Sequence, residues 1–111
     1  MSTTHLHLLQ SFFFLQLLFF SGCVSKIATV QQNIDRYKDQ LVTVRGKVQE
    51  TLTIPGIQTG IYQIEDNSGR IWVISSNQIP KRGERVLVQG TVLTGIEVLG
   101  KKFGTVIREL D

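Results

Sequence analysis

The sequence is poor in the residues that most often carry chemistry. It contains one cysteine, Cys23, which excludes an intrachain disulfide, so the fold must rest on its core alone. Both histidines, His5 and His7, lie within the first ten residues, so the rest of the chain has no imidazole for general-base work near neutral pH. It also has no Cys/His set for zinc and no Gly-Lys-Ser/Thr ending of a P-loop. We therefore expect no enzyme, no metal site and no cofactor.

Charge is absent from the first part of the chain. Residues 1–25 contain no Lys, Arg, Asp or Glu, and Phe12 to Phe20 is an apolar run. Polar residues interrupt the stretch from Leu6 to Phe20, and a permanent membrane span needs ~20 apolar residues, so we expect no such span. The length instead fits the hydrophobic region of a cleavable secretory signal peptide over residues 1–22.

The end of this segment, Phe20-Ser21-Gly22-Cys23, resembles the lipobox of bacterial lipoproteins, in which the cysteine is lipidated and becomes the mature N-terminus. The resemblance implies a protein of the cell envelope, anchored through Cys23 to the periplasmic or extracellular side of a bacterial membrane. Residues 23–26 would then be a tether. The alternatives are an ordinary buried thiol at Cys23, plain export without a lipid, and an uncleaved anchor.

Residues 27–111 form one domain in this interpretation, because a chain of 111 residues is too short for two. All 12 basic and 9 acidic residues lie after residue 25, which gives this part of the chain a net charge of +3. That excess permits weak attraction to polyanions but does not require it.

The motif Val-x-Val-x-Gly-x-Val occurs twice, from Val42 to Val48 and from Val86 to Val92. Both copies alternate apolar and polar residues with period two, which predicts strands with one face in a core. A glycine inside a strand is unfavourable unless the backbone bends or bulges there. Gly46 and Gly90 therefore predict a small, curved sheet that closes on itself.

The remaining elements follow from similar patterns. Apolar residues three and four apart predict a short helix within Ser25 to Tyr37, with Ser25 as its candidate N-cap. The expected strands are Leu41 to about Thr51, Ile61 to Glu65, Arg70 to Ser75, Glu84 to Leu93 and Thr105 to Leu110. Proline and glycine place loops between them, at Ile54 to Gly60, Asp66 to Gly69, Asn77 to Gly83 and Gly95 to Gly104.

An all-β chain of five short strands with an N-terminal capping helix fits the OB-fold, a partly open Greek-key barrel. The pattern Tyr62-x-Ile64-x-Asp66-x-Ser68-Gly69-x-Ile71-x-Val73 resembles the strand 2–3 hairpin of bacterial OB-fold domains of the tRNA-anticodon-binding type. It is also similar to small secreted bacterial OB-fold proteins, and the resemblance covers residues 27–110. Inside the hairpin loop, we expect Asp66 to accept hydrogen bonds from its own turn amides.

The resemblance implies a ligand surface, because OB-folds bind on the outer face of strands 2 and 3 and at the strand 1–2 and 4–5 loops. Here that surface would carry Trp72, Arg70, Gln63, Glu65, Arg45, Lys47, Lys101, Lys102 and Phe103. An exposed tryptophan among basic residues suits single-stranded nucleic acid, through base stacking and phosphate pairing. In the alternative interpretation, Trp72 packs under the 4–5 loop or the helix, and Lys101 and Lys102 form a solvated loop tip.

Two classes of function remain. The first is an exported, lipid-anchored, non-enzymatic binding module that takes single-stranded nucleic acid or an oligosaccharide. The second is an envelope lipoprotein scaffold whose barrel binds a protein partner and no nucleic acid. A lipid-tethered domain outside the cell seldom meets RNA or DNA, whereas OB barrels also bind oligosaccharides.

Overall fold

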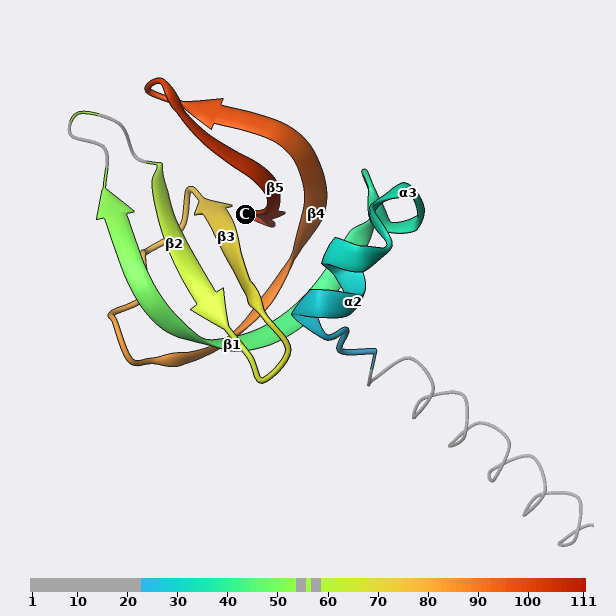
Figure 1. Cartoon of the computed structure of the whole chain (residues 1–111). Coiled ribbons are helices and arrows are strands. Elements are labelled where there is room, and N and C mark those ends of the chain that lie inside the picture. The colour runs from blue at the N-terminus through green and yellow to red at the C-terminus, as the bar shows by residue number, and fades with distance from the viewer. Residues whose placement is uncertain (1–22, 54–55, 57–58) are drawn as a thin grey trace, which may run out of the picture.

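The two valine motifs lie in the two longest strands of the described chain, β1 (Leu41–Thr53) and β4 (Arg85–Val98) (Figure 1). The other elements are helices α2 (Ile27–Gln32) and α3 (Ile34–Tyr37) and strands β2 (Gly60–Glu65), β3 (Arg70–Ser75) and β5 (Lys101–Glu109). This computed structural model describes residues 23–53, 56 and 59–111. The predicted signal peptide of residues 1–22 lies outside the described residues, as do residues 54–55 and 57–58 of a predicted loop.

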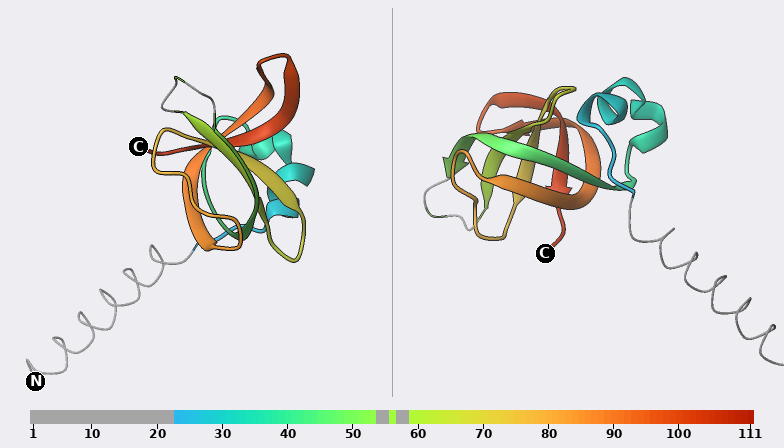
Figure 2. Two further views of the ribbon diagram at one scale, coloured as in Figure 1. Left: turned by 90° about the vertical axis from the view of Figure 1, so that its left-hand side faces the viewer. Right: turned by 90° about the horizontal axis from the view of Figure 1, so that it is seen from below.

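The five strands close into a barrel in the order β1-β2-β3-β5-β4 (Figure 2). Four of the five neighbouring pairs are antiparallel. Only β3 and β5 run parallel, and their pairing closes the barrel, because the chain crosses from β3 to β4 before it returns as β5. The two short helices pack at one side of the barrel, next to the start of β1 (Figure 2). This architecture confirms the small all-β barrel of OB type that the sequence predicted.

Side chains that alternate inward along the strands fill the barrel. Val86 of the second valine motif is only partly buried, whereas these inward-facing side chains are buried: Val42, Val44, Val48, Tyr62, Ile64, Ile71 and Val73. Ile27 and Val30, both on one face of α2, belong to the same core cluster. Burying an aliphatic side chain of this size contributes ~1.5–3 kcal/mol, so the helix is part of the folding unit and not an appendage.

Gly46 and Gly90 lie where the two long strands change partners. The N-terminal half of β1 pairs with β4 and its C-terminal half with β2, and β4 passes from β1 to β5 near Gly90. A Cβ atom on Gly46 would lie 3.0 Å from the Glu65 carbonyl oxygen, and one on Gly90 would lie 2.8 Å from the Arg108 carbonyl carbon. The predicted curvature is therefore present, and the glycines allow backbones to approach closely where the strands coil.

The predicted helical segment is present, but it is divided into α2 and α3, and Ser25 is not its N-cap. The Ser25 N–H donates a 2.8 Å hydrogen bond to the Thr43 carbonyl oxygen, and Ser25 forms an isolated parallel bridge with Val44. Lys26 holds the N-cap position of α2, without a side-chain cap of its own. Asn33 separates α2 from α3, and its side-chain amide donates a 2.8 Å hydrogen bond to the Thr29 carbonyl oxygen. Such bonds compete with the backbone hydrogen bonds of a helix, which is why asparagine favours helix ends.

The β2–β3 hairpin loop caps helix α2 from a distant part of the chain. Asp66 Oδ2 accepts a 3.0 Å hydrogen bond from the Ile27 N–H, and Ser68 Oγ accepts one of 3.0 Å from the Ala28 N–H. The other oxygen of Asp66 accepts from the backbone of Ser68 and Gly69, which confirms the predicted turn. The first amides of a helix lack partners within it, so this loop supplies the missing acceptors.

The predicted loop from Gly95 to Gly104 is also wrong. Strands β4 and β5 extend through most of it, and only Leu99 and Gly100 form the turn. Both have positive φ, 51° and 80°, as a tight two-residue hairpin turn requires. The flanking glycines that suggested a loop lie where the β4–β5 register shifts. Three predicted loop residues are therefore strand residues: Lys101, Lys102 and Phe103.

Candidate functional site

The outer face of β2 and β3 carries the side chains that alternation sends outward. Trp72 lies opposite Gln63, and Arg70 lies opposite Glu65, in the antiparallel register. Residues paired in this way share one face of a sheet, and β1 continues the face through the residues opposite Gln63 and Glu65. We define the β2–β3 face by these residues: Lys47, Glu50, Gln63, Glu65, Arg70 and Trp72.

Side chains from β3 and β5 form a cluster at one edge of this face. The ring centroids of Trp72 and Phe103 lie 5.2 Å apart with their planes at 79°, an edge-to-face arrangement. Lys101 Nζ lies 5.6 Å from the Trp72 centroid and 5.3 Å from the Phe103 centroid, within the range of cation–π attraction. Both rings are half-buried and Lys101 is exposed. We refer to Trp72, Phe103 and Lys101 as the aromatic–lysine cluster.

The parallel pairing of β3 with β5 brings this cluster together. Trp72 lies beside Val106 in that register, and Phe103 precedes Val106 on the same strand. Phe103 therefore covers one edge of the indole ring, as expected if Trp72 packs against the segment between strands 4 and 5. The sequence left this packing open as one of two interpretations, because the contact depends on a crossover that pairs two strands distant in the chain.

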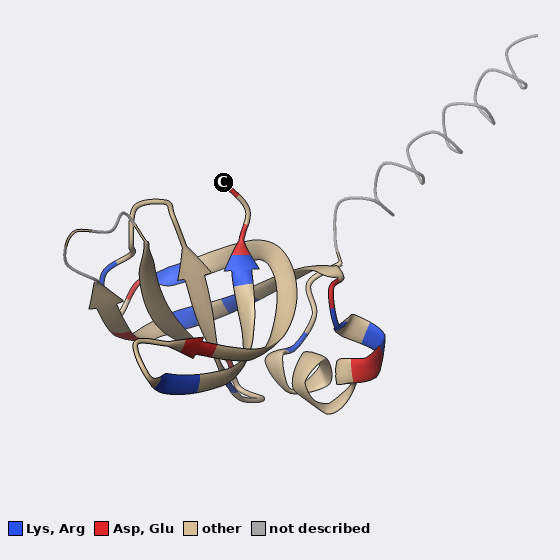
Figure 3. Ribbon diagram, turned by 90° about the horizontal axis from the view of Figure 1, so that it is seen from above, with Lys and Arg blue, Asp and Glu red and all other residues tan. Residues whose placement is uncertain are grey.

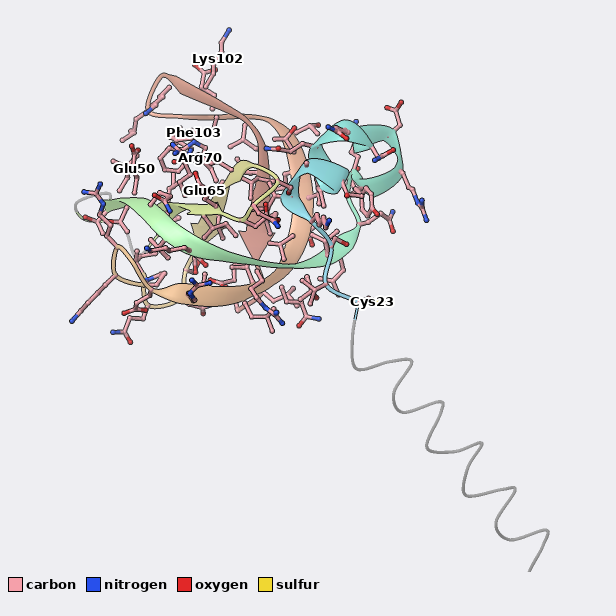
Figure 4. The ribbon with its side chains drawn as sticks, turned by 60° about the horizontal axis from the view of Figure 1, so that its bottom comes forward. Cys23, Glu50, Glu65, Arg70, Lys102 and Phe103 are labelled. Atoms are coloured by element: carbon pink, nitrogen blue, oxygen red, sulfur yellow. The ribbon has the colours of Figure 1, made fainter. Side chains whose placement is uncertain are left out.

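The charges on and around the face are mixed. Arg70 and Glu65 form an ion pair whose side chains are 58% and 36% exposed, so it contributes little to stability. Lys102 lies opposite Glu97 on the neighbouring strand. Glu50, which the sequence analysis missed, adds negative charge next to Glu65 and Arg70 (Figure 4). Along the described part of the ribbon, basic and acidic residues alternate in several elements (Figure 3).

Arg45, which was also predicted for this surface, lies at its border, because it precedes Lys47 by two residues on β1 and shares a groove with Lys47 and Glu65. It lies opposite Leu87 of β4, and no residue of β2 pairs with it. It also lines a second groove together with Cys23 and Val24. The coil of β1 at Gly46 explains this position, because residues before the bend pair with β4 and residues after it pair with β2.

Cys23 is exposed, so its interpretation as an ordinary buried thiol is wrong. The segment of residues 23–26 is held to the barrel from Ser25 onward, where the backbone hydrogen bond to Thr43 begins. Within the part of the chain that the structure describes, no helix has the length and hydropathy needed to cross a membrane.

Asp66 is committed to capping and does not serve as a proton donor. Burial alone would raise the pKa of this carboxyl, but hydrogen bonds from Ile27, from the hydroxyl and backbone of Ser68 and from Gly69 lower it below its ordinary value. The group is therefore ionised at neutral pH, in the state that accepts these bonds.

Away from the β2–β3 face, polar side chains of three strands contact one another: Tyr62 of β2, Ser75 of β3 and Glu109 of β5. Burial, and then the charge and hydrogen bond of Glu109, raise the pKa of the Tyr62 hydroxyl above its ordinary value. Glu109 also accepts a 2.6 Å hydrogen bond from Ser75 Oγ. A phenol with a raised pKa stays neutral at neutral pH, so the Tyr62 hydroxyl is not a candidate general base. Among the described residues, no three or more His, Cys, Asp or Glu gather closely enough to hold a metal ion.

Comparison with known proteins bears on the fold. No family model matches the chain, and no curated protein matches it. Among solved structures, a protein from Leishmania major Friedlin described as an aspartyl-tRNA synthetase matches with a TM-score of 0.61 at 13% sequence identity. The match covers 80% of this chain but only 20% of that one, so the chain spans a small part of the synthetase's length. At this identity the chain is similar to that protein in fold alone, and the likeness agrees with a barrel of OB type.

Proposed function

We propose that this chain is a non-enzymatic OB-fold binding module whose aromatic–lysine cluster binds single-stranded nucleic acid. The observation that carries the proposal is the gathering of Trp72, Phe103 and Lys101 beside the β2–β3 face, where OB-folds bind their ligands. Aromatic rings stack on unpaired bases, and an ammonium group beside them pairs with the phosphates. The fold match to a protein named for tRNA supports the same class of ligand.

The surrounding charges set the expected strength of binding. Lys47 on the β2–β3 face and Lys102 on β5 are exposed cations, but Arg70 is already paired with Glu65. Glu50 lies on the same face and would repel phosphate. We therefore expect weak binding at low salt that falls further as the salt concentration rises, since few counterions are released.

We further propose that the protein is exported and is held by a lipid on Cys23 to the periplasmic or extracellular side of a bacterial membrane. Three observations support this: the uncharged apolar segment before Cys23, its lipobox-like sequence, and the exposure of the thiol. A single acyl chain binds membranes only marginally, so firm attachment would need several. The intact mass of membrane-extracted protein tests the proposal. A mass equal to residues 23–111 plus acyl groups supports it, and an unmodified mass contradicts it.

An envelope scaffold that binds a protein partner is the second candidate. It is favoured by the packing within the cluster, because Trp72 is contacted by Phe103 and Lys101. In this alternative, the same side chains fix the β4–β5 hairpin to β3, and the barrel binds no nucleic acid.

The fluorescence of Trp72, the only tryptophan in the chain, provides the test. We expect oligo-dT at low salt to quench it, and Phe103→Ala and Lys101→Gln to weaken the binding. Lys81→Gln on the β3–β4 connection removes the same charge outside the site and is the matched control. Quenching by oligosaccharides alone would replace nucleic acid as the ligand. No response to either ligand would favour the scaffold.

A further inference from the structure

The chain between Cys23 and the barrel is very short. The Ser25 N–H donates its 2.8 Å hydrogen bond to the Thr43 carbonyl oxygen, and helix α2 is then fixed by the β2–β3 loop. Only Val24 separates Cys23 from the first of these contacts, and two residues span at most ~7 Å. A lipid on Cys23 would therefore hold the barrel directly at a membrane surface, without a flexible tether.

The surface around Cys23 exposes aliphatic side chains among polar ones. An open groove of about 610 Å³ runs along the outer side of β1 and β4, and Cys23 lies in its wall. Val24, Leu41 and Leu87 line the groove with exposed fractions of 42%, 56% and 59%. We refer to the groove that these three side chains line as the apolar groove. Large aliphatic side chains that gather in the open mark a surface with a partner.

Basic side chains border the apolar groove. Arg45 lies opposite Leu87 in the β1–β4 register, and Arg85 comes two residues before Leu87 on β4. Both arginines line an adjoining groove with Lys26, and all three cations are exposed. The acidic side chains of that adjoining groove are engaged elsewhere, one in the ion pair with Arg70 and the other in capping α2.

We propose that the apolar groove and its basic border form the surface on which the barrel rests against a bilayer that contains anionic phospholipids. This inference rests on the proposed lipid on Cys23. The leucines would enter the boundary between headgroups and acyl chains, while the arginines pair with lipid phosphates. A bilayer is the occupant because the short connection to Cys23 brings this face, and no other, against the membrane.

This orientation has a consequence for the candidate ligand site. Lys102 and Phe103 lie on the opposite side of the barrel from Cys23 (Figure 4). With the apolar groove against the membrane, the aromatic–lysine cluster would face away from the bilayer and stay open to a ligand. One side of the barrel would then attach the protein to the membrane, while another side binds the ligand.

Quenching by nitroxide-labelled lipids tests the orientation with the full chain reconstituted from membranes into vesicles of phosphatidylethanolamine and phosphatidylglycerol. Three proteins each carry a single tryptophan. They are the wild type with Trp72, Leu87→Trp in a Trp72→Phe background, and Leu99→Trp in the same background. Leu99 is 84% exposed at the β4–β5 turn and is the matched control. We expect headgroup-labelled lipids to quench the Leu87→Trp protein several-fold more than either of the other two.

Equal quenching of the Leu87→Trp and Leu99→Trp proteins, in vesicles that retain both, would overturn the proposed surface and leave the lipid anchor intact. Stronger quenching of Trp72 than of the Leu87→Trp protein would show that another face rests on the membrane. The intact mass of each sample separates the two proposals. A protein without lipid that the vesicles do not retain contradicts both the anchor and the surface.

Discussion

The two ends of the barrel hold their side chains by different kinds of contact. At the helix end, Asp66 and Ser68 are fully engaged, because they accept hydrogen bonds that fix α2 to the β2–β3 loop. At the hairpin end, Lys101 and Phe103 contact Trp72 only through weak ring interactions and stay partly open to solvent. Side chains with full hydrogen-bond partners stabilise the fold at the helix end, whereas the loosely held side chains at the hairpin end remain available to a ligand.

The largest loss of stability should follow from substituting the glycines in the barrel wall between the two ends. Gly90→Ala would place a Cβ atom 2.8 Å from the Arg108 carbonyl carbon, so two backbones must move apart. We expect the free energy of unfolding to fall by about 3 kcal/mol or more, measured by urea denaturation followed by circular dichroism. Gly46→Ala, with its nearest atom at 3.0 Å, should cost about 1–2 kcal/mol. An equal or reversed order would contradict the account of strand coiling.

The helix end should depend on its cap. Asp66→Ala removes the acceptor for the Ile27 N–H and for the turn amides, and we expect a loss of about 2 kcal/mol in unfolding free energy. Asn67→Ala changes an exposed neighbour in the same loop and should stay within about 0.5 kcal/mol of wild type. If both variants lost the same stability, the loop would matter for its backbone and not for the Asp66 carboxylate.

The contribution of Asp66 should also depend on pH. Its pKa is lowered in the folded state, so the stabilisation is fully present above the unfolded pKa of about 3.9 and is lost as pH falls through the folded value. The difference in unfolding free energy between wild type and Asp66→Asn should therefore be largest at neutral pH and shrink below about pH 4. Denaturation curves over this pH range measure the difference in unfolding free energy. A difference that grows on acidification would contradict a lowered pKa of Asp66 in the folded state.

The smallest effect on stability belongs to the hairpin end. Phe103→Ala removes one edge-to-face ring contact and should cost about 1 kcal/mol of unfolding free energy. The same change should weaken oligonucleotide binding by about 1–3 kcal/mol, measured by fluorescence titration. Leu99→Ala removes an exposed side chain from the same hairpin and should alter neither quantity. Loss of stability without loss of binding would assign Phe103 to packing alone.

The sequence predicted those parts of the molecule that depend on local patterns. Alternation placed Val44 and Val73 in the core and sent Trp72 to the opposite face, because the period of a strand is fixed by its backbone. It did not predict that Asp66 caps α2 or that Phe103 meets Trp72. Both contacts join residues that are far apart in the chain, and only the closed topology brings them together.

Amide hydrogen exchange of the full chain, with and without oligo-dT at low salt, tests most directly whether the two ends differ in function. The account predicts that the ligand slows exchange in β3 and around Lys101 to Phe103, and leaves Ser25 to Ala28 unchanged. Unchanged exchange throughout the chain, or protection confined to the helix end, would contradict a ligand site at the aromatic–lysine cluster.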